Sequence, residues 1–514
     1  MPDILAVHAA VHPDRPALRC GEEVVTYRGY DEDSNRAARA LLALGVRPGD
    51  RVAIMSFNSI DAFTASAGIR KATAVGVPIN FRLRGEELAY IVRDSGARVV
   101  CAGPDFVEHV EAATAHLAER PVLLALGDAP GLPGPPAGWL AMAALMADQP
   151  ADAPAEDAAL DGAGRAMIYT SGTTGRPKGA FREAGVTPEA VLAAIQMFGL
   201  QPGDVHLMAG PGYHSAVSAF CGLTTICAGT IVVMPRFDPA RAVALIEEQR
   251  VTTTFMAPTL LHRIMDLPAE VREAHDVSSL RALILGAAPC PFSLKARAIA
   301  YFGQVLWEFY GATETSFNLL LEPADQLRKP GSAGRPVPGQ ELLLLDDDGS
   351  PVADGQPGEL WVRNESLATY HNRPDATARS MRDGFFSVGD VAYRDADGYY
   401  YICDRKVDMV ISGGVNIYPA EVEACLYAHP DVSDVAVIGV PDDQWGEAVK
   451  ALVVRQPGAT VGETELIDWC RARIADYKRP RSIDFVDELP RDQAGKLLKR
   501  QIRARFWAGS GRTI

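Results

Sequence analysis

Residues 169–179 combine the residue types that bind a phosphate group. They read Tyr-Thr-Ser-Gly-Thr-Thr-Gly-Arg-Pro-Lys-Gly. Glycines let the backbone turn its N–H groups inward around an anion, hydroxyls add donors, and Arg176 and Lys178 add positive charge. The loop differs from a Walker A loop, because Pro177 stands at the place of the second glycine and Gly179 at that of the Mg²⁺-binding Ser or Thr. A flexible turn is the alternative, but the density of these residue types favours a nucleotide-phosphate site.

Three later segments could surround a bound nucleotide and an acid. Tyr213 and His214 stand on a Gly/Pro turn and could line a pocket, although a lone histidine is more often a structural hydrogen-bonder. Residues 286–289 are small and follow an apolar strand, where parallel sheets bind ligands, but a tight turn fits them equally well. Residues 310–315 offer an aromatic ring, a glycine, a hydroxyl and a carboxylate that could hold Mg²⁺. The alternative for this segment is a helix N-terminus capped by Thr313.

Two more segments supply a carboxylate, glycines and cations. Asp390 follows a glycine and could accept both hydroxyls of a ribose, or lie on a surface turn. The other segment combines Gly413 and Gly414 with the basic pattern of residues 490–499, which includes Lys496. Basic runs are usually solvated faces, but this spacing is more particular than a charge run.

The composition is typical of a globular protein with several structural units. The chain has 514 residues, 48% hydrophobic and 22% charged, and a net charge of −15, which argues against nucleic acid or an anionic membrane as a general partner. Its eight cysteines are scattered without a C-x-x-C pair, as in a reducing compartment. The N-terminus does not resemble a signal peptide, and no window of about 18 apolar residues could span a bilayer. We expect a cytoplasmic location.

Strands alternate with helices over most of the chain, which predicts an α/β fold of layered parallel sheets. In the first 125 residues we expect helices over 33–44, 62–74 and 86–95, and strands over 51–55, 76–80 and 98–101. The alternation resumes over 188–302, with strands at 231–234 and 283–285. Residues 341–345 and 358–363 then predict a β-rich section with antiparallel pairing.

A charged segment at 404–408 joins this body to a last piece of domain size. In that piece we expect helices over 420–428 and 463–475 and strands over 435–440 and 449–454. The sequence therefore predicts a large N-terminal domain, residues 1–404, and a small, mobile α+β C-terminal domain, residues 405–514.

The segments, their order and their spacing resemble the acyl-adenylate-forming superfamily, which includes acyl-CoA synthetases, aryl-CoA ligases, firefly luciferase and peptide-synthetase adenylation domains. The resemblance covers essentially the whole chain, from residue 26 to residue 499. Each motif alone is a moderate signal, and the ordered set is a very strong one. It implies a fold of layered α/β subdomains with a β-rich section and a small C-terminal domain.

The resemblance also implies a role for each segment. The β- and γ-phosphates of ATP would be held by Thr170, Ser171, Gly172, Thr173, Thr174, Gly175 and Lys178. Adenine would be flanked by Gly286, Ala287, Ala288, Pro289 and Tyr310, and Gly311 and Ala312 would also belong to the cofactor site. Thr313 would contact the α-phosphate, Glu314 would bind Mg²⁺, and Asp390 with Arg405 would hold the ribose. Lys496 would bridge the carboxylate and the α-phosphate, and Gly413 and Gly414 would line the channel for coenzyme A.

These roles imply a ligase that works in two steps. A carboxylate attacks the α-phosphate of ATP, so positive charge is needed where two anions meet. Pyrophosphate leaves, and the thiol of coenzyme A then displaces AMP from the acyl-adenylate. Lys496 and Gly413 are more than eighty residues apart, and the resemblance implies that they serve successive steps, with rotation of the small domain about residues 404–408 between them.

Three positions depart from the family pattern. Val388 stands where a threonine usually precedes the Gly-Asp pair, and Val407 stands at a hinge position that is often Asp or Lys. After the phosphate loop, residues 181–184 read Phe-Arg-Glu-Ala where a Thr-His pair is common. None of these changes removes a principal catalytic group.

The acid is expected to be hydrophobic, either fatty or aromatic. Relatives that activate amino acids carry an Asp where this chain has His214, and a buried ammonium without a partner would cost several kcal/mol. Tyr213, His214, Gly286, Gly311 and Ala312 are the expected acid contacts. Two alternatives stay open: transfer to a carrier-protein thiol or only one half-reaction, and a non-catalytic nucleotide sensor. The sequence also leaves open whether the protein is a homodimer.

Overall fold

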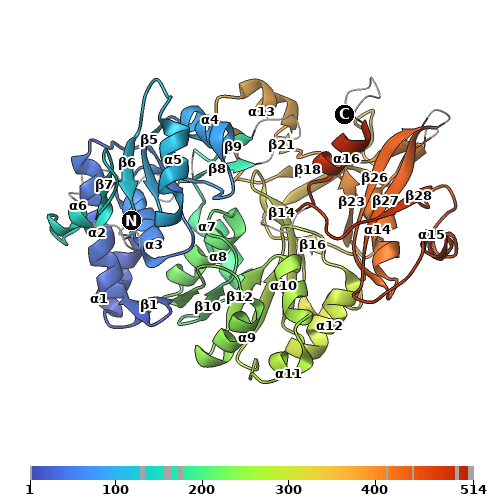
Figure 1. Cartoon of the computed structure of the whole chain (residues 1–514), viewed down its shortest axis with the longest axis horizontal. Helices are drawn as coiled ribbons and strands as arrows, with labels where there is room; N and C mark the ends of the chain where they lie inside the picture. Colours follow the sequence, from blue (N-terminus) through green and yellow to red (C-terminus); the bar gives the residue numbers. More distant parts are fainter. Residues whose placement is uncertain are drawn as a thin grey trace.

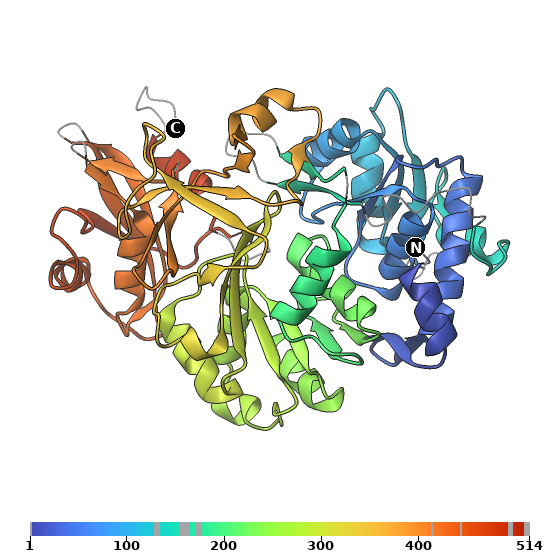
Figure 2. The ribbon, with the colours of Figure 1, turned by 180° about the vertical axis from the view of Figure 1, so that it is seen from behind.

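The computed structural model describes residues 3–127, 134–154, 165–170, 177–183, 185–406, 408–412, 415–442, 445–491 and 497–507. In this part of the chain the strands form five sheets. The N-terminal helices and the C-terminal strands lie at opposite ends of the molecule (Figure 1 and Figure 2). None of the helices within the described ranges is both long and apolar enough to cross a membrane.

The N-terminal elements build a parallel sheet in the order β4-β3-β5-β6-β7. Its strands are β3 (Arg51–Met55), β4 (Val75–Pro78), β5 (Ala97–Ala102), β6 (Val122–Ala125) and β7 (Leu140–Ala141). The helices of this part are α1 (Ile4–Val11), α2 (Tyr27–Ala43), α3 (Ile60–Lys71), α4 (Gly85–Ser95), α5 (Val107–Thr114) and α6 (Met142–Ala147). The prediction for 33–44 began too late, because Thr26 accepts a hydrogen bond from Gly29 N at 3.2 Å and caps α2 at Tyr27.

The largest sheet runs β16-β15-β14-β13-β12-β10-β11-β1-β2. Its strands are β1 (Pro16–Cys20), β2 (Glu23–Thr26), β10 (Val205–Met208), β11 (Thr230–Val233), β12 (Thr253–Met256), β13 (Ala282–Leu285), β14 (Leu306–Ala312), β15 (Ser316–Leu321) and β16 (Arg335–Pro336). The neighbours from β14 to β1 are parallel. All residues of β11, β12 and β13 are buried, as expected for strands that are covered on both faces.

Helices from the middle of the chain form those two covers. They are α7 (Pro188–Met197), α8 (Ser215–Ile226), α9 (Pro239–Glu248), α10 (Pro258–Met265), α11 (Ala269–Arg272) and α12 (Phe292–Phe302). Ile231 packs in one core with Phe220 of α8, whereas the next residue, Val232, packs in the other with Leu245 of α9. This alternation fixes the sheet between two helical layers. Figure 1 shows these elements in green and yellow in the middle of the molecule.

Two smaller sheets connect this body to the C-terminal elements. The first runs β19-β9-β8 and contains β8 (Met167–Thr170), β9 (Lys178–Phe181) and β19 (Thr369–Tyr370). The second contains β17 (Glu341–Leu345), β18 (Gly358–Arg363), β20 (Met381–Arg382), β21 (Phe385–Phe386), β22 (Asp390–Arg394) and β23 (Tyr400–Arg405). Because β17 pairs antiparallel with β18, the β-rich section predicted from residue 341 is confirmed. The short helix α13 (Pro374–Ser380) precedes β20.

The C-terminal elements form their own sheet. Its strands are β24 (Val410–Ser412), β25 (Val415–Ile417), β26 (Val432–Asp442), β27 (Gly446–Arg455) and β28 (Ser482–Phe485), and its helices are α14 (Pro419–Tyr427), α15 (Glu463–Arg471) and α16 (Lys499–Trp507). The predicted helices and strands of this part are present with shifted ends. The sequence around α16 reads as a basic run, yet Ile502 of this helix is fully buried in the core beside Leu452.

Candidate active site

The strands β8 and β9 bring the two ends of the predicted phosphate loop together. They pair antiparallel, with Thr170 opposite Lys178. The last register pair of these two strands therefore carries a hydroxyl and an ammonium group. The predicted contacts Ser171, Gly172, Thr173, Thr174 and Gly175 lie outside the described residues.

Glu314 lies against this register pair, 144 residues away from Thr170 along the chain. Its carboxylate is buried, and Thr170 Oγ1 donates to Glu314 Oε1 at 3.1 Å. Tyr370 Oη donates to the same oxygen at 3.0 Å, and Lys178 Nζ lies 4.6 Å from the centre of the Tyr370 ring. Tyr370 was not among the predicted site residues. It reaches the site because β19 pairs with β9, and no local motif marks it in the sequence.

The donor set at Glu314 fits Mg²⁺. This ion takes one or two carboxylates together with phosphate oxygens and water, and rarely a cage made of protein alone. Glu314 offers one buried carboxylate beside the hydroxyl of Thr170. Within the described ranges, no group of three or more His, Cys, Asp or Glu side chains could hold a metal ion by itself. The phosphate groups of a bound nucleotide would have to complete the coordination.

Residues 313–315 form the turn of a β-hairpin between β14 and β15. The turn is closed by a bond from Thr315 N to Ala312 O at 3.1 Å. A Cβ atom on Gly311 would lie 2.1 Å from Ser316 O, so only glycine fits where the two strands meet. The alternative of a helix N-terminus capped by Thr313 is wrong, because β15 continues the chain as an antiparallel strand.

The nucleoside contacts predicted from three distant segments lie together. Tyr310 Oη donates a hydrogen bond to Asp390 Oδ2, and Asp390 is buried at the start of β22. Residues 286–289 follow β13, which is parallel to β14 and adjacent to it. Gly286 passes close to this strand, since a Cβ atom there would lie 2.7 Å from the Phe309 ring. Arg405 is the register partner of Asp390 on β23.

The Tyr213-His214 turn lies beside the same hairpin. It follows β10 and leads into α8, and the rings of Tyr213 and His214 are 4.6 Å apart. Ser215 Oγ, at the start of α8, is 3.4 Å from Thr313 Oγ1. The expected acid contacts are therefore next to the expected α-phosphate contact. Tyr213 also packs edge-to-face on Phe81, at 5.2 Å between ring centres.

Arg182, one of the departures from the family pattern, lies behind this hairpin. Its Nη2 donates to Thr313 O and its Nε to Ser366 O, both at 2.5 Å. Burial lowers the pKa of Arg182, and the nearby Glu314 charge opposes that shift. The other departures contribute less: Val388 packs among Tyr370, Ala376 and Phe386, and Val407 lies outside the described residues.

The predicted residues of the C-terminal part lie outside the described ranges. They are Gly413, Gly414 and Lys496, and the side chain of Arg405 is outside them as well. The structure does describe their surroundings. Gly413 and Gly414 connect β24 to β25, and Arg491 and Leu497, on either side of Lys496, form an antiparallel bridge.

Comparison with known protein families shows which family the chain belongs to. The profile of the family described as AMP-binding enzyme matches residues 5–370, and that of the AMP-binding enzyme C-terminal domain matches residues 421–496. The chain belongs to the AMP-binding enzyme family.

Individual relatives place this AMP-binding enzyme in the acyl-CoA synthetase branch, as the ordered motifs predicted. A feruloyl-CoA synthase of Amycolatopsis sp is 40% identical over 503 residues, 97% of each chain. The fatty acid–[acyl-carrier-protein] ligase ScoC of Streptomyces coeruleorubidus is 33% identical over 518 residues, 99% of this chain and 96% of its own. The solved anthranilate CoA ligase AuaEII in complex with anthranoyl-AMP has a TM-score of 0.89 at 28% identity, covering 99% of this chain and 98% of its own.

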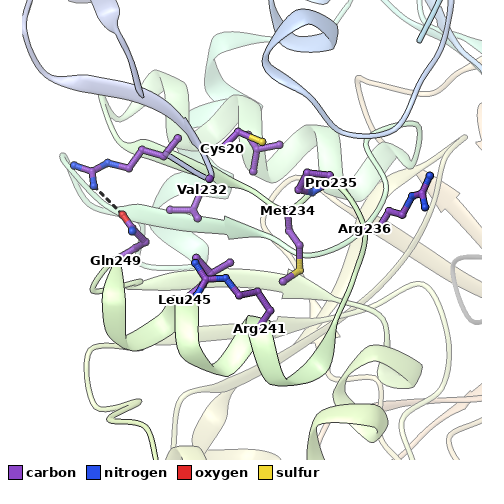
Figure 3. Close-up of a pocket in the computed structure, with 11 residues that line it drawn as sticks. Cys20, Val232, Met234, Pro235, Arg236, Arg241, Leu245 and Gln249 are labelled. Atoms are coloured by element: carbon purple, nitrogen blue, oxygen red, sulfur yellow. Dashed lines mark hydrogen bonds between the residues drawn. The ribbon is translucent and has the colours of Figure 1, made fainter. Parts of the chain in front are cut away.

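A separate pocket of this AMP-binding enzyme, about 290 Å³ in volume, lies between β1, β11 and α9. Arg19, Arg236 and Arg241 are among its lining residues. Figure 3 shows that Arg236 points away from the other labelled side chains, where it pairs with Asp105 at 2.9 Å. Arg19 donates to Gln249 at 2.8 Å and Arg241 pairs with Glu248. The three guanidinium groups do not converge, so the pocket is not built as an anion site.

Proposed function

We propose that this enzyme is an ATP-dependent acid–CoA ligase for a hydrophobic, aromatic carboxylic acid. One observation carries the proposal: Thr170, Lys178 and Glu314 meet at the base of the phosphate loop, beside the hairpin that carries Tyr310. The residues that we assign to pyrophosphate and to the nucleoside are thus neighbours, and the Tyr213-His214 turn is next to them. This is the set that an enzyme needs in order to adenylate an acid.

In the first step, the acid carboxylate attacks the α-phosphorus of ATP and pyrophosphate leaves. Lys178 and the hydroxyl of Thr170 would stabilise the departing pyrophosphate, and Thr313 would hold the α-phosphate. Mg²⁺ bound at Glu314 would supply further positive charge to the phosphate oxygens. Lys496 would draw the carboxylate toward the α-phosphate despite their like charges.

In the second step, the sulfur of coenzyme A attacks the acyl carbon, loses its proton and displaces AMP. The Tyr310 bond to Asp390 would keep the nucleoside in place through both steps. The scattered free cysteines, which include the buried Cys101 and Cys221, support a cytoplasmic location with a reducing environment.

The acid is proposed to be aromatic because a feruloyl-CoA synthase is similar over nearly the whole chain. The site agrees with a flat hydrophobic group, since Tyr213 offers an aromatic wall. His214 stands where a carboxylate would be needed to pair with the ammonium group of an amino acid.

Transfer to the thiol of a carrier protein is the second candidate. It is favoured by the similarity to ScoC, a fatty acid–[acyl-carrier-protein] ligase that matches the chain over 99% of its length. This candidate shares the adenylation step and differs only in the acceptor.

The test is to incubate the protein with ATP, Mg²⁺ and single acids, and to measure pyrophosphate exchange and thioester formation separately. Ferulate, benzoate, octanoate, palmitate and phenylalanine are suitable acids, with coenzyme A or a phosphopantetheinyl carrier protein as the acceptor. We expect exchange and CoA-thioester formation with an aromatic acid and neither with phenylalanine. Exchange with thioester formed only on the carrier protein would select the second candidate, and no exchange with any acid would contradict both.

A further inference from the structure

Arg182 is partly buried, and none of the ion pairs between described residues includes it. Among the described residues, no carboxylate oxygen lies within 4.0 Å of its guanidinium nitrogens, and its hydrogen bonds go to two backbone carbonyls, Thr313 O and Ser366 O. Taking a guanidinium out of water is costly unless its donors are satisfied. An apolar side chain could fill the same space at lower cost, so the cation and its fixed donors call for a reason beyond packing.

Each of the three carbonyl groups of the hairpin turn accepts a hydrogen bond, either from Arg182 or from the 364–368 segment. Arg182 binds Thr313 O, Ala368 N donates to Glu314 O at 2.8 Å, and Asn364 Nδ2 donates to Thr315 O at 2.8 Å. Because Nε of Arg182 also binds Ser366 O, its guanidinium joins the turn to the 364–368 segment that holds the other two carbonyls.

The side chains of the same turn contact different elements from those that hold its carbonyls. Thr313 Oγ1 is 3.4 Å from Ser215 Oγ at the start of α8. Glu314 Oε1 accepts from Thr170 at the end of β8. Rotation of the Thr313 peptide group would move both side chains, and Arg182 is the group that fixes that peptide.

We propose that Arg182 is a positioning residue that sets the orientation of Thr313 and Glu314 toward the phosphates of the nucleotide. The proposal deepens the proposed function and rests on it for the reaction, but it also concerns nucleotide binding alone. Arg182 comes directly after β9, so it couples the strand that ends the phosphate loop to the turn that would hold the α-phosphate. The guanidinium shape matters, because two donors in a fixed fork must reach two carbonyls.

The experiment compares Arg182→Gln and Arg182→Lys with the matched control Arg272→Gln. Arg272 is also largely buried and donates to a backbone carbonyl, Met265 O at 3.0 Å, but it lies at the end of α11 and contacts none of the residues of the candidate site that the structure describes. Three quantities are measured: the thermal midpoint, the affinity for AMP by calorimetry without Mg²⁺ or acid, and kcat and KM for ATP in pyrophosphate exchange.

We expect the two Gln variants to lose thermal stability to a similar extent, and only Arg182→Gln to lose function. A displaced catalytic group costs on the order of 100-fold, so we expect kcat of exchange to fall about 100-fold in Arg182→Gln and about tenfold in Arg182→Lys, which keeps the charge and one bond. AMP affinity should fall about fivefold in Arg182→Gln and stay unchanged in Arg272→Gln.

Equal effects of Arg182→Gln and Arg272→Gln on AMP affinity and on exchange per folded molecule would overturn the proposal. If the wild-type protein shows no pyrophosphate exchange with any of the tested acids, the proposed function fails. The affinity for AMP in the variants still decides the role of Arg182. Unchanged AMP affinity and unchanged exchange in folded Arg182→Gln would also overturn it.

Discussion

Asp390 and Tyr310 show how a buried carboxylate can be kept ready for a ligand. Asp390 accepts the hydroxyl of Tyr310 and is only 7% exposed. A carboxylate can accept about four hydrogen bonds, and Tyr310 supplies one of them, so we expect Asp390 to accept from the hydroxyls of a ribose as well. The Tyr310 ring is held at the same time, which fixes the position expected to face adenine.

We predict that Asp390→Asn raises KM for ATP at least about tenfold and changes kcat less, because contacts to the ribose are present in both the ground state and the transition state. The measurement is pyrophosphate exchange at varied ATP concentration. Asp397→Asn is the control and should leave KM unchanged. Asp397 is an exposed carboxylate that pairs with Lys329. A large loss of kcat at unchanged KM would contradict this role.

The sequence predicted which residue types the site would contain, and it missed residues that only strand pairing brings there. Thr170 and Glu314 were each expected at the site because each belongs to a recognisable local motif, although their contact was not predicted. Tyr370 and Arg182 have no such motif. Tyr370 depends on β19 pairing with β9, and the partners of Arg182 are backbone carbonyls, which every sequence contains.

At the scale of elements, three strands of the largest sheet, β10, β13 and β14, lead into segments of the candidate site. The strand β10 carries His206, which is 1% exposed and whose Nδ1 lies 2.9 Å from Thr253 Oγ1 of the neighbouring β12. Burial lowers the pKa of His206 to about 4, and the charge of Asp204 opposes that shift. The imidazole is therefore neutral in the folded protein at neutral pH.

This depressed pKa predicts a pH dependence of stability. The unfolded chain takes up a proton at His206 near pH 6.5, whereas the folded protein does so only near pH 4. The contribution of the neutral His206 imidazole to the free energy of unfolding is fully present above pH 6.5 and is lost as the pH falls toward 4. The loss amounts to about 2 kcal/mol between pH 7 and pH 5.

We expect His206→Gln to reduce the fall in the free energy of unfolding over that interval by about 2 kcal/mol. Urea unfolding at pH 7 and pH 5 measures it. His116→Gln serves as the control, because His116 is exposed and should leave the pH dependence as in the wild type. If the free energy of unfolding changed equally with pH in the wild type and in both variants, the pH dependence could not be assigned to His206.

Element types were predictable from the sequence, and element ends were less so. The strand at 51–55 matches β3 residue for residue, because a short apolar run between polar residues leaves little freedom. The helix α16 was missed because its exposed face is basic and only a few residues, such as Ile502 and Trp507, are buried. Its place is decided by packing on β26, where Trp507 donates to Gly439 O at 3.0 Å.

At the scale of the whole molecule, specific contacts tie the C-terminal elements to the end of β23. Asp404 Oδ2 accepts from Ala420 N at 3.0 Å, at the start of α14, and lies 3.5 Å from Lys499 Nζ. On the other side, Lys406 pairs with Asp347 at 2.9 Å. Asp404 and Lys406 of the predicted hinge at 404–408 are thus held by α14 and α16 on one side and by the β-rich section on the other, and a rotation there would have to change these contacts.

The rotation predicts that Lys496 acts in the first step alone. In Lys496→Ala we expect pyrophosphate exchange to fall about 10²–10³-fold, the cost of removing one well-aimed charge. Thioester formation from supplied acyl-adenylate should stay within about threefold of the wild type, because other residues would then face the site. Arg500→Ala is the control for charge on the same segment, since Arg500 is exposed on α16, and it should leave both steps unchanged. Equal loss of both steps in Lys496→Ala would mean that one arrangement of the chain serves the whole reaction.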